Sequence, residues 1–146
     1  MSKIEKVLFT GKTHTTFSDA TRAHGNLDIE LSSPGDAKPA HVFAATQAHP
    51  TAEQLFAGAW SACYISAIEH IAKAKKVVLP ADASVDIEID LGQAGQAYFL
   101  QARFFVRLPG VAHDVATALA HAAHELCPYS KATLGNIDVA VNVLTA

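Results

Sequence analysis

Apolar and polar residues alternate at several places along the chain, and each alternation predicts a half-buried strand. These segments are residues 3–10, 26–32, 84–91 and 136–144. A further strand is expected over residues 96–108, because Gly92 to Gly95 form a turn and the flanking runs then make a hairpin. Residues 14–25 are expected to be a polar connection.

Two other segments repeat apolar residues at three- and four-residue steps, which predicts helices. The first begins at Thr51, because Thr51-Ala-Glu-Gln54 has the form of a capping box. It runs for about 24 residues, or roughly 36 Å. The second helix is expected over residues 112–126 and is stopped by Pro128. The residues that recur at these steps along the first helix are Leu55, Phe56, Ala59, Ala62, Cys63, Ser66, Ala67, His70 and Ile71.

The order of these elements is strands, helix, hairpin, helix and strand, which indicates an α+β fold with antiparallel sheet covering the helices. Residues 33–50 contain several prolines and few periodic apolar positions, and so predict a long loop of a kind that is often functional. With 146 residues, half of them hydrophobic, the chain is expected to be one domain over residues 1–146. Small residues in the first helix allow a second subunit to approach it closely.

Charge and targeting signals exclude some functions. The net charge is -3 and the eleven basic residues are dispersed, so nucleic acid is not an expected partner. The N-terminal residues alternate charged and apolar side chains, and no apolar run approaches the length of a membrane span. We therefore expect a soluble, cytoplasmic protein.

The two cysteines, Cys63 and Cys127, are the candidate chemical groups. They lie 64 positions apart and match no zinc-binding spacing, and each can equally be a small buried hydrophobe. Cys63 lies in the middle of the first helix, where burial raises a thiol pKa unless a cation is near. Cys127 directly precedes Pro128 and is expected at a frayed, exposed helix end. Two such thiols can form a peroxidatic and resolving pair, but their spacing does not show that they meet.

Two motifs around these cysteines resemble a known family. The stretch Glu53-Gln-Leu-Phe-Ala-Gly-Ala-Trp-Ser-Ala-Cys63 is similar to the first cysteine motif of the organic hydroperoxide resistance (Ohr) branch of the OsmC-like proteins. The stretch His124-Glu-Leu-Cys127-Pro-Tyr-Ser-Lys-Ala-Thr-Leu-Gly-Asn-Ile-Asp138 is similar to the second. The N-terminal Ile4-Glu-Lys-Val-Leu-Phe-Thr10 also resembles the start of that family, so the resemblance spans nearly the whole chain.

The resemblance implies an OsmC-like α+β fold, with antiparallel sheets packed around two long central helices in an intertwined homodimer. It also implies a thiol peroxidase that reduces organic hydroperoxides to alcohols, binds no cofactor, and is recycled by a dithiol such as a protein-bound lipoyl group. Carried onto this chain, Cys63 is the peroxidatic nucleophile and Cys127 the resolving thiol. Glu53 corresponds to the carboxylate that orients an arginine beside the thiolate, and Tyr129 and Ser130 are expected to fix the Cys127 loop.

The geometry of a helix complicates the role of Glu53. Ten helical residues separate Glu53 from Cys63 by about 15 Å, too far for direct contact. Either a cation bridges the two groups, the start of the helix bends, or Glu53 serves the active site of a partner chain.

The sequence departs from the family at the arginine. Ser18 stands about where the family has this residue, in the stretch Thr16-Phe-Ser-Asp-Ala20, and Arg22 is the candidate to replace it. Arg103 and Arg107 are weaker candidates because they fall on strand positions. Phe43, in the altered long loop, either lines an apolar substrate channel or anchors the loop, and Leu134 stands where the family often has a second arginine.

Two alternatives compete with the peroxidase. His121, His124 and Cys127 recur at three-residue steps, but three residues do not make a four-ligand zinc site, and we expect no metal. The other alternative is a non-catalytic OsmC-like module that binds a small apolar molecule or a partner in the dimer crevice. The altered arginine loop is the sign that favours it.

Overall fold

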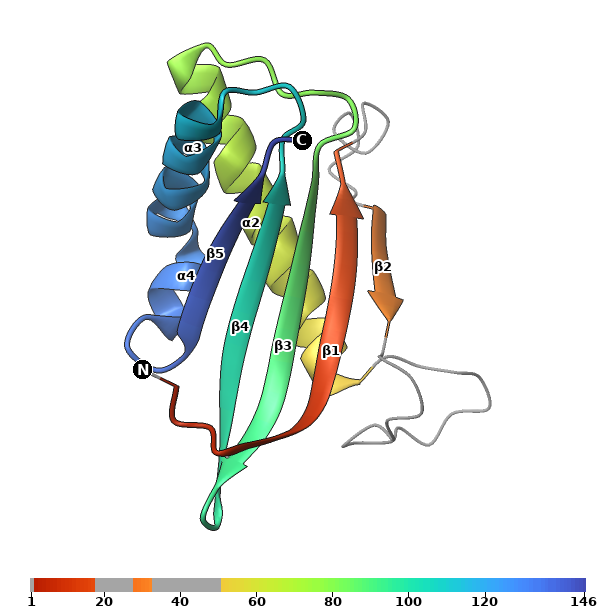
Figure 1. Ribbon diagram of the computed structural model, residues 1–146, viewed down its shortest axis with the longest axis vertical. Coiled ribbons are helices and arrows are strands. Elements are labelled where there is room, and N and C mark those ends of the chain that lie inside the picture. The colour runs from red at the N-terminus through yellow and green to blue at the C-terminus, as the bar shows by residue number, and fades with distance from the viewer. Residues whose placement is uncertain (1, 18–27, 33–50) are drawn as a thin grey trace.

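The computed structural model describes residues 2–17, 28–32 and 51–146. In this part of the chain, one sheet has the strand order β2-β1-β3-β4-β5. Figure 1 shows α2 crossing one face of the sheet obliquely, with α3 and α4 beside it toward β5. The strands are β1 (Lys6–Thr16), β2 (Asp28–Ser32), β3 (Ser84–Ala94), β4 (Ala97–Arg107) and β5 (Asp138–Leu144). The helices are α2 (Ala52–Lys75), α3 (His113–Leu126) and α4 (Pro128–Thr133).

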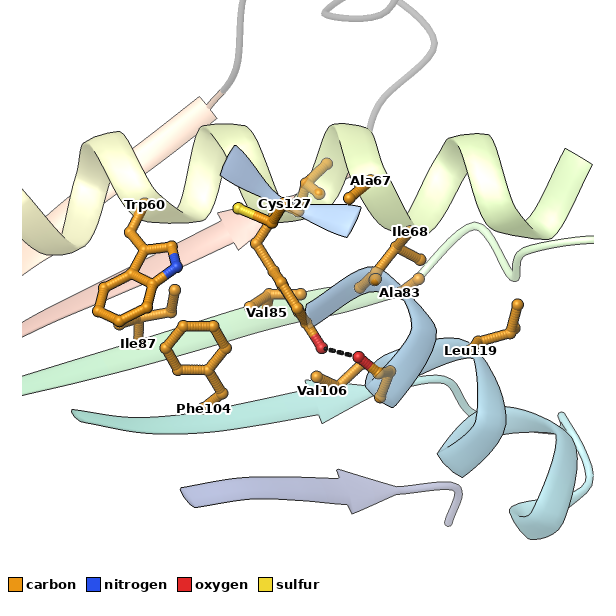
Figure 2. Close-up of a cluster of buried hydrophobic side chains, with 14 of the residues drawn as sticks. Trp60, Ala67, Ile68, Ala83, Val85, Ile87, Phe104, Val106, Leu119 and Cys127 are labelled. Atoms are coloured by element: carbon orange, nitrogen blue, oxygen red, sulfur yellow. Dashed lines mark hydrogen bonds between the residues drawn. The ribbon is translucent and has the colours of Figure 1, made fainter. Parts of the chain in front are cut away.

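The α+β class is confirmed, and the core forms between α2 and one face of the sheet. The inward-facing side chains of β3 and β4 are apolar and fully or nearly fully buried: Val85, Ile87, Ile89, Ala102, Phe104 and Val106. The intervening residues point to the other face, as the two-residue period of a strand requires. Figure 2 shows the Trp60 ring between α2 and the strands, near Ile87 and Phe104.

The predicted start of α2 is confirmed. The Gln54 N–H donates to the Thr51 hydroxyl at 3.2 Å, and the Thr51 N–H donates to the Gln54 side chain at 2.9 Å. Gly11 in β1 lies directly against this first turn, because a Cβ added to Gly11 would lie 2.7 Å from the Gln54 nitrogen and 2.8 Å from the Glu53 Cβ. β1 therefore packs tightly on the turn that carries Glu53.

The face of α2 that is buried differs from the predicted one. Leu55, Ala59, Ser66 and His70 are exposed, and Cys63 is only partly buried. Of the predicted positions only Ala67 is fully in the core, which otherwise contains the other side of the helix: Ala57, Trp60, Ser61, Tyr64, Ile65, Ile68 and Ala72. The helix is apolar on both sides, so the period alone did not identify the side that meets the sheet.

Strand boundaries and one strand pairing also differ from the sequence prediction. β1 continues to Thr16, into the segment expected to be a connection. The hairpin turns later than predicted, because β3 continues to Ala94 and Gly95 takes a left-handed φ of 57°. The sheet is antiparallel as expected except at one edge, where β5 pairs parallel to β4. The parallel pairing follows from the crossover through α3 and α4, which returns the chain to the end of the sheet where β4 began.

The predicted loop over residues 33–50, including Phe43, lies outside the described residues, as do Ser18 and Arg22. In the part of the chain that the structure describes, no helix has the length and apolar character needed to cross a membrane.

Candidate functional site

The two cysteines meet where α2 passes the junction of α3 and α4. Their sulfurs lie 2.7 Å apart, although 64 residues separate them in sequence. Both are free thiols. Cys63 is partly exposed on α2, whereas Cys127 is completely buried. The fold thus supplies the proximity that the sequence left open, and it makes Cys63 the more accessible of the two sulfurs.

Cys127 is held at a change of chain direction. It ends α3 and precedes α4 with an extended backbone (φ -61°, ψ 122°), as expected for a residue before proline. Its N–H donates to the Ala123 carbonyl at 2.9 Å, and its own carbonyl accepts from the Lys131 N–H at 3.1 Å. The expectation of a frayed, exposed thiol is wrong, because Pro128 starts a new helix instead of ending the folded segment.

The surroundings of Cys63 do not favour its thiolate. Burial, followed by contact with the Cys127 thiol, raises the pKa of Cys63 to about 11, although a hydrogen bond from the Tyr129 backbone acts in the opposite direction. No cation among the described residues contributes to this shift. At neutral pH only about one molecule in ten thousand would then carry the reactive thiolate.

Glu53 is an unusual buried carboxylate. It is 5% exposed, and its Oε2 has no hydrogen-bond partner among the described residues. α2 is one continuous helix from Ala52 to Lys75, so Glu53 and Cys63 stay about 15 Å apart along its axis. The alternative of a bent helix start gains no support, because the helix is unbroken between the two residues. The other two alternatives are a bridging cation and a role of Glu53 in a partner's site.

The described arginines are engaged elsewhere. The Arg103 side chain donates to both carboxylate oxygens of Asp90, at 2.5 Å and 2.9 Å, and also contacts Glu88. Arg107 pairs with Asp86 at 3.4 Å. The two arginines on β4 and their acidic partners on β3 alternate with the residues that face the core. Both guanidinium groups therefore lie on the face of the sheet away from α2. The chain has only three arginines, and the third is Arg22.

The described structure gives no support to a zinc site at His121, His124 and Cys127. His121 is exposed, whereas the His124 ring packs against Tyr64 and Phe104, with centroids 6.4 Å and 5.8 Å away. Burial, and then the neighbouring His121, lowers the pKa of His124. Within the described ranges, no group of three or more His, Cys, Asp or Glu side chains is arranged to hold a metal ion.

Two aromatic residues of α2 also contact the segment that carries Cys127. The Trp60 indole N–H donates to the Ser130 hydroxyl at 3.0 Å, and the Tyr64 hydroxyl donates to the Ala120 carbonyl at 2.8 Å. Sequence reasoning placed Ser130 near Cys127 but missed both partners. For Trp60 the sequence did contain a signal: this residue precedes Cys63 by three residues, about one helical turn, and so lies close to the thiol along α2.

Comparison with known proteins identifies the family. The family model described as OsmC-like protein matches residues 45–142, which contain both cysteines. The chain belongs to the OsmC-like family. An organic hydroperoxide resistance protein of Xanthomonas axonopodis pv. citri (strain 306) is 34% identical over 146 residues, covering 98% of this chain and 99% of that protein. This likeness places the chain in the Ohr branch of the OsmC-like family.

Solved structures of OsmC-like proteins agree with the described fold. The organic hydroperoxide resistance protein OhrB of Bacillus subtilis has a TM-score of 0.63 and 30% identity, and the match covers 93% of this chain and 98% of OhrB. An organic hydroperoxide resistance protein from Elizabethkingia anophelis has a TM-score of 0.65 and 25% identity, with both chains covered completely. The OsmC-like fold expected from the sequence motifs is therefore confirmed.

Proposed function

We propose that this protein is a cysteine-based peroxidase that reduces organic hydroperoxides to alcohols. The observation that carries the proposal is the 2.7 Å contact between an accessible thiol, Cys63, and a buried one, Cys127. The names of its relatives, which refer to organic hydroperoxide resistance, support the substrate class. The partly exposed Cys63 thiol can meet a peroxide, and the buried Cys127 thiol is already in position to complete a disulfide.

The proposed cycle has three steps. The Cys63 thiolate attacks a peroxide oxygen: the S–O bond forms, the O–O bond breaks, and the alkoxide leaves as the alcohol after taking a proton. Cys127 then attacks the sulfur of the resulting sulfenic acid, which forms the disulfide and releases water. Finally a dithiol reductant, of the lipoyl type, returns both cysteines to thiols and becomes a cyclic disulfide. Because Cys127 has no exposed surface, the reductant attacks the Cys63 sulfur.

The first step needs a cation, and we assign this role to Arg22. Without a positive charge the pKa of Cys63 stays near 11, and the other two arginines are paired with carboxylates on the far face of the sheet. The buried Glu53 carboxylate is a suitable group to orient a guanidinium, since its Oε2 has no hydrogen-bond partner in the part of the chain that the structure describes. Arg22 and Glu53 are therefore proposed as positioning residues for the Cys63 thiolate.

We further propose a homodimer in which Glu53 of one chain serves Cys63 of the other. The exposed side of α2 carries Leu55, which is 46% exposed, together with the small residues Ala59 and Ser66. Small side chains let a second helix approach closely, and covering Leu55 would stabilise the pair. A partner chain also removes the difficulty that about 15 Å of continuous helix separates Glu53 from its own Cys63.

The function is tested by following the loss of cumene hydroperoxide with dihydrolipoamide as the reductant. We expect turnover, with one intramolecular disulfide per chain appearing when the reductant is omitted. Hydrogen peroxide is expected to be a poorer substrate, because the partly buried thiol lies among apolar side chains. If there is no turnover and Cys63 does not react with iodoacetamide at neutral pH, the non-catalytic module is favoured instead. The high pKa of Cys63 in its described surroundings is consistent with that alternative.

The arrangement of Glu53 is tested with mixed dimers. A Glu53→Gln protein and a Cys63→Ser protein are each expected to have little activity. When the two are unfolded together and refolded, about half of the dimers combine one chain of each kind. If Glu53 acts on the partner's Cys63, the mixed dimer holds one site with both substitutions and one with neither, so the mixture regains about a quarter of the wild-type activity per chain. If Glu53 acts within its own chain, the mixture stays inactive.

A further inference from the structure

A buried hydrogen bond lies next to the thiol contact and joins the same two parts of the chain. The Trp60 indole N–H donates to the Ser130 hydroxyl at 3.0 Å. Trp60 is completely buried and Ser130 is 3% exposed, so neither group can exchange this partner for bulk water. A buried hydrogen bond of this kind is costly to break, because both groups would lose their only described partner without gaining solvent.

The hydrogen bond and the thiol contact are separated by the same number of residues on both segments. Trp60 precedes Cys63 by three residues on α2, and Ser130 follows Cys127 by three residues in α4. α2 therefore touches the segment from Cys127 into α4 at two points about one turn apart, once through the indole and once through the sulfurs. A shift of α4 that separates the sulfurs must also stretch or break the hydrogen bond.

The Trp60 side of this link is rigid. Its ring packs on Phe56, with centroids 5.5 Å apart, and edge-on against Phe104, at 5.0 Å and 82°. Figure 2 shows the ring enclosed between α2 and the strands, with Phe104 beneath it. The donor direction is thus fixed by the core and not by the site.

The Ser130 side depends on this link. α4 has six residues, and a helix this short has little stability of its own in water. The Ser130 carbonyl accepts from the Thr133 hydroxyl at 3.1 Å, and the Cys127 carbonyl accepts from the Lys131 N–H at 3.1 Å, so α4 and Cys127 move as one unit. The Trp60 donor ties that unit to α2.

We propose that the Trp60–Ser130 hydrogen bond positions Cys127 and so sets the rate at which its sulfur attacks Cys63. This inference rests on the proposed redox role of the two thiols, to which it adds two positioning residues. The attack is a displacement in which the Cys127 sulfur must approach Cys63 opposite the leaving group. When the bond is lost, α4 can shift, and the Cys63 sulfenic acid persists long enough for a second hydroperoxide to oxidise it to sulfinic acid.

The test isolates this displacement from any peroxide chemistry. Reduced protein receives one equivalent of dithiobis(nitrobenzoate): Cys63 takes one nitrobenzoate thiol as a mixed disulfide and releases the other. Cys127 then attacks the Cys63 sulfur, forms the internal disulfide, and expels the second nitrobenzoate thiolate, while the Cys127 proton goes to solvent. The rate of the second release, followed by absorbance, measures the positioning of Cys127 directly.

Trp60→Phe keeps an aromatic ring without the donor, and Ser130→Ala removes only the acceptor oxygen. Each is expected to slow the second release about fivefold, the loss expected when one buried hydrogen bond is removed from a transition state. The double variant is expected to be no slower than either single one. The matched control is Thr13→Val, which removes a different buried contact of α2, that of Thr13 Oγ1 with Ser61 Oγ at 3.0 Å, and should change the rate less than twofold.

The outcomes are decisive in either direction. An unchanged second release in both variants would overturn the proposal, and so would equal slowing in Thr13→Val, which would indicate general loosening. If Trp60→Phe does not fold, Ser130→Ala alone decides, since it removes a single atom. A wild-type protein that reduces no hydroperoxide but shows the expected exchange rates would refute the peroxidase and leave the positioning role intact.

Discussion

Cys63→Ser is expected to lose organic hydroperoxide reduction by about three orders of magnitude or more, because the hydroxyl that replaces the thiol is a far weaker nucleophile. Cys63 is the accessible member of the pair, and the 2.7 Å contact leaves Cys127 buried behind it. The remaining thiol therefore cannot take over the first step. The measurement is the initial rate of cumene hydroperoxide loss with dihydrolipoamide.

Cys127→Ser is the matched control, because it alters the other sulfur of the same contact. Without added reductant, it should consume one equivalent of hydroperoxide, since the first step needs only Cys63, and then stop with Cys63 as a sulfenic acid that dimedone captures. No internal disulfide can form in this variant. The assignment is wrong if Cys127→Ser loses the first equivalent while Cys63→Ser retains it.

Arg22→Ala is expected to lower the rate at neutral pH by about 100-fold or more, because each unit of thiol pKa changes the thiolate fraction tenfold. The charged form of a thiol is the deprotonated one, so a nearby cation lowers its pKa and removal of that cation raises it. In the described surroundings the pKa of Cys63 is about 11. The variant should therefore recover activity as the pH rises toward that value.

The pH dependence of iodoacetamide labelling at Cys63 measures this effect without substrate. Labelling of the wild-type protein should have its midpoint well below 11, and labelling of Arg22→Ala should have it near 11. Arg107→Ala is the control, because its guanidinium pairs with Asp86 on the far face of the sheet and should leave the midpoint unchanged. A midpoint that is the same in wild type and Arg22→Ala would show that Arg22 is not the activating cation.

Local signals in the sequence were sufficient for most elements, with α4 the exception, but not for the surfaces that meet. The Thr51–Gln54 capping box placed the start of α2 correctly because it is a contact over three residues. The buried side of α2 depends on the sheet, and both sides of the helix offer apolar residues. The parallel pairing of β5 was also not predictable from alternation, because a two-residue period defines a strand and not its neighbour.

In the candidate site, too, the sequence identified some features and others needed the fold. The cysteines were found from motifs, yet their contact and the burial of Cys127 needed the fold. Pro128 suggested a helix end, and it is indeed the end of α3, but proline is also well suited to the first turn of a helix. The α4 helix that begins there covers the thiol. Trp60 was read only as part of a motif, and the hydrogen bond to Ser130 appears only when both segments are in place.

The 64 residues between the thiols and the late position of β5 also have a consequence for synthesis. A ribosome that has released Cys63 must still make the β3–β4 hairpin and α3 before Cys127 exists, and β5 after that. The nascent chain therefore carries the first thiol for a period in which no second thiol is available to protect it. In the proposed cycle, a hydroperoxide that reached this unfinished chain would leave an oxidised sulfur that only an outside thiol could rescue.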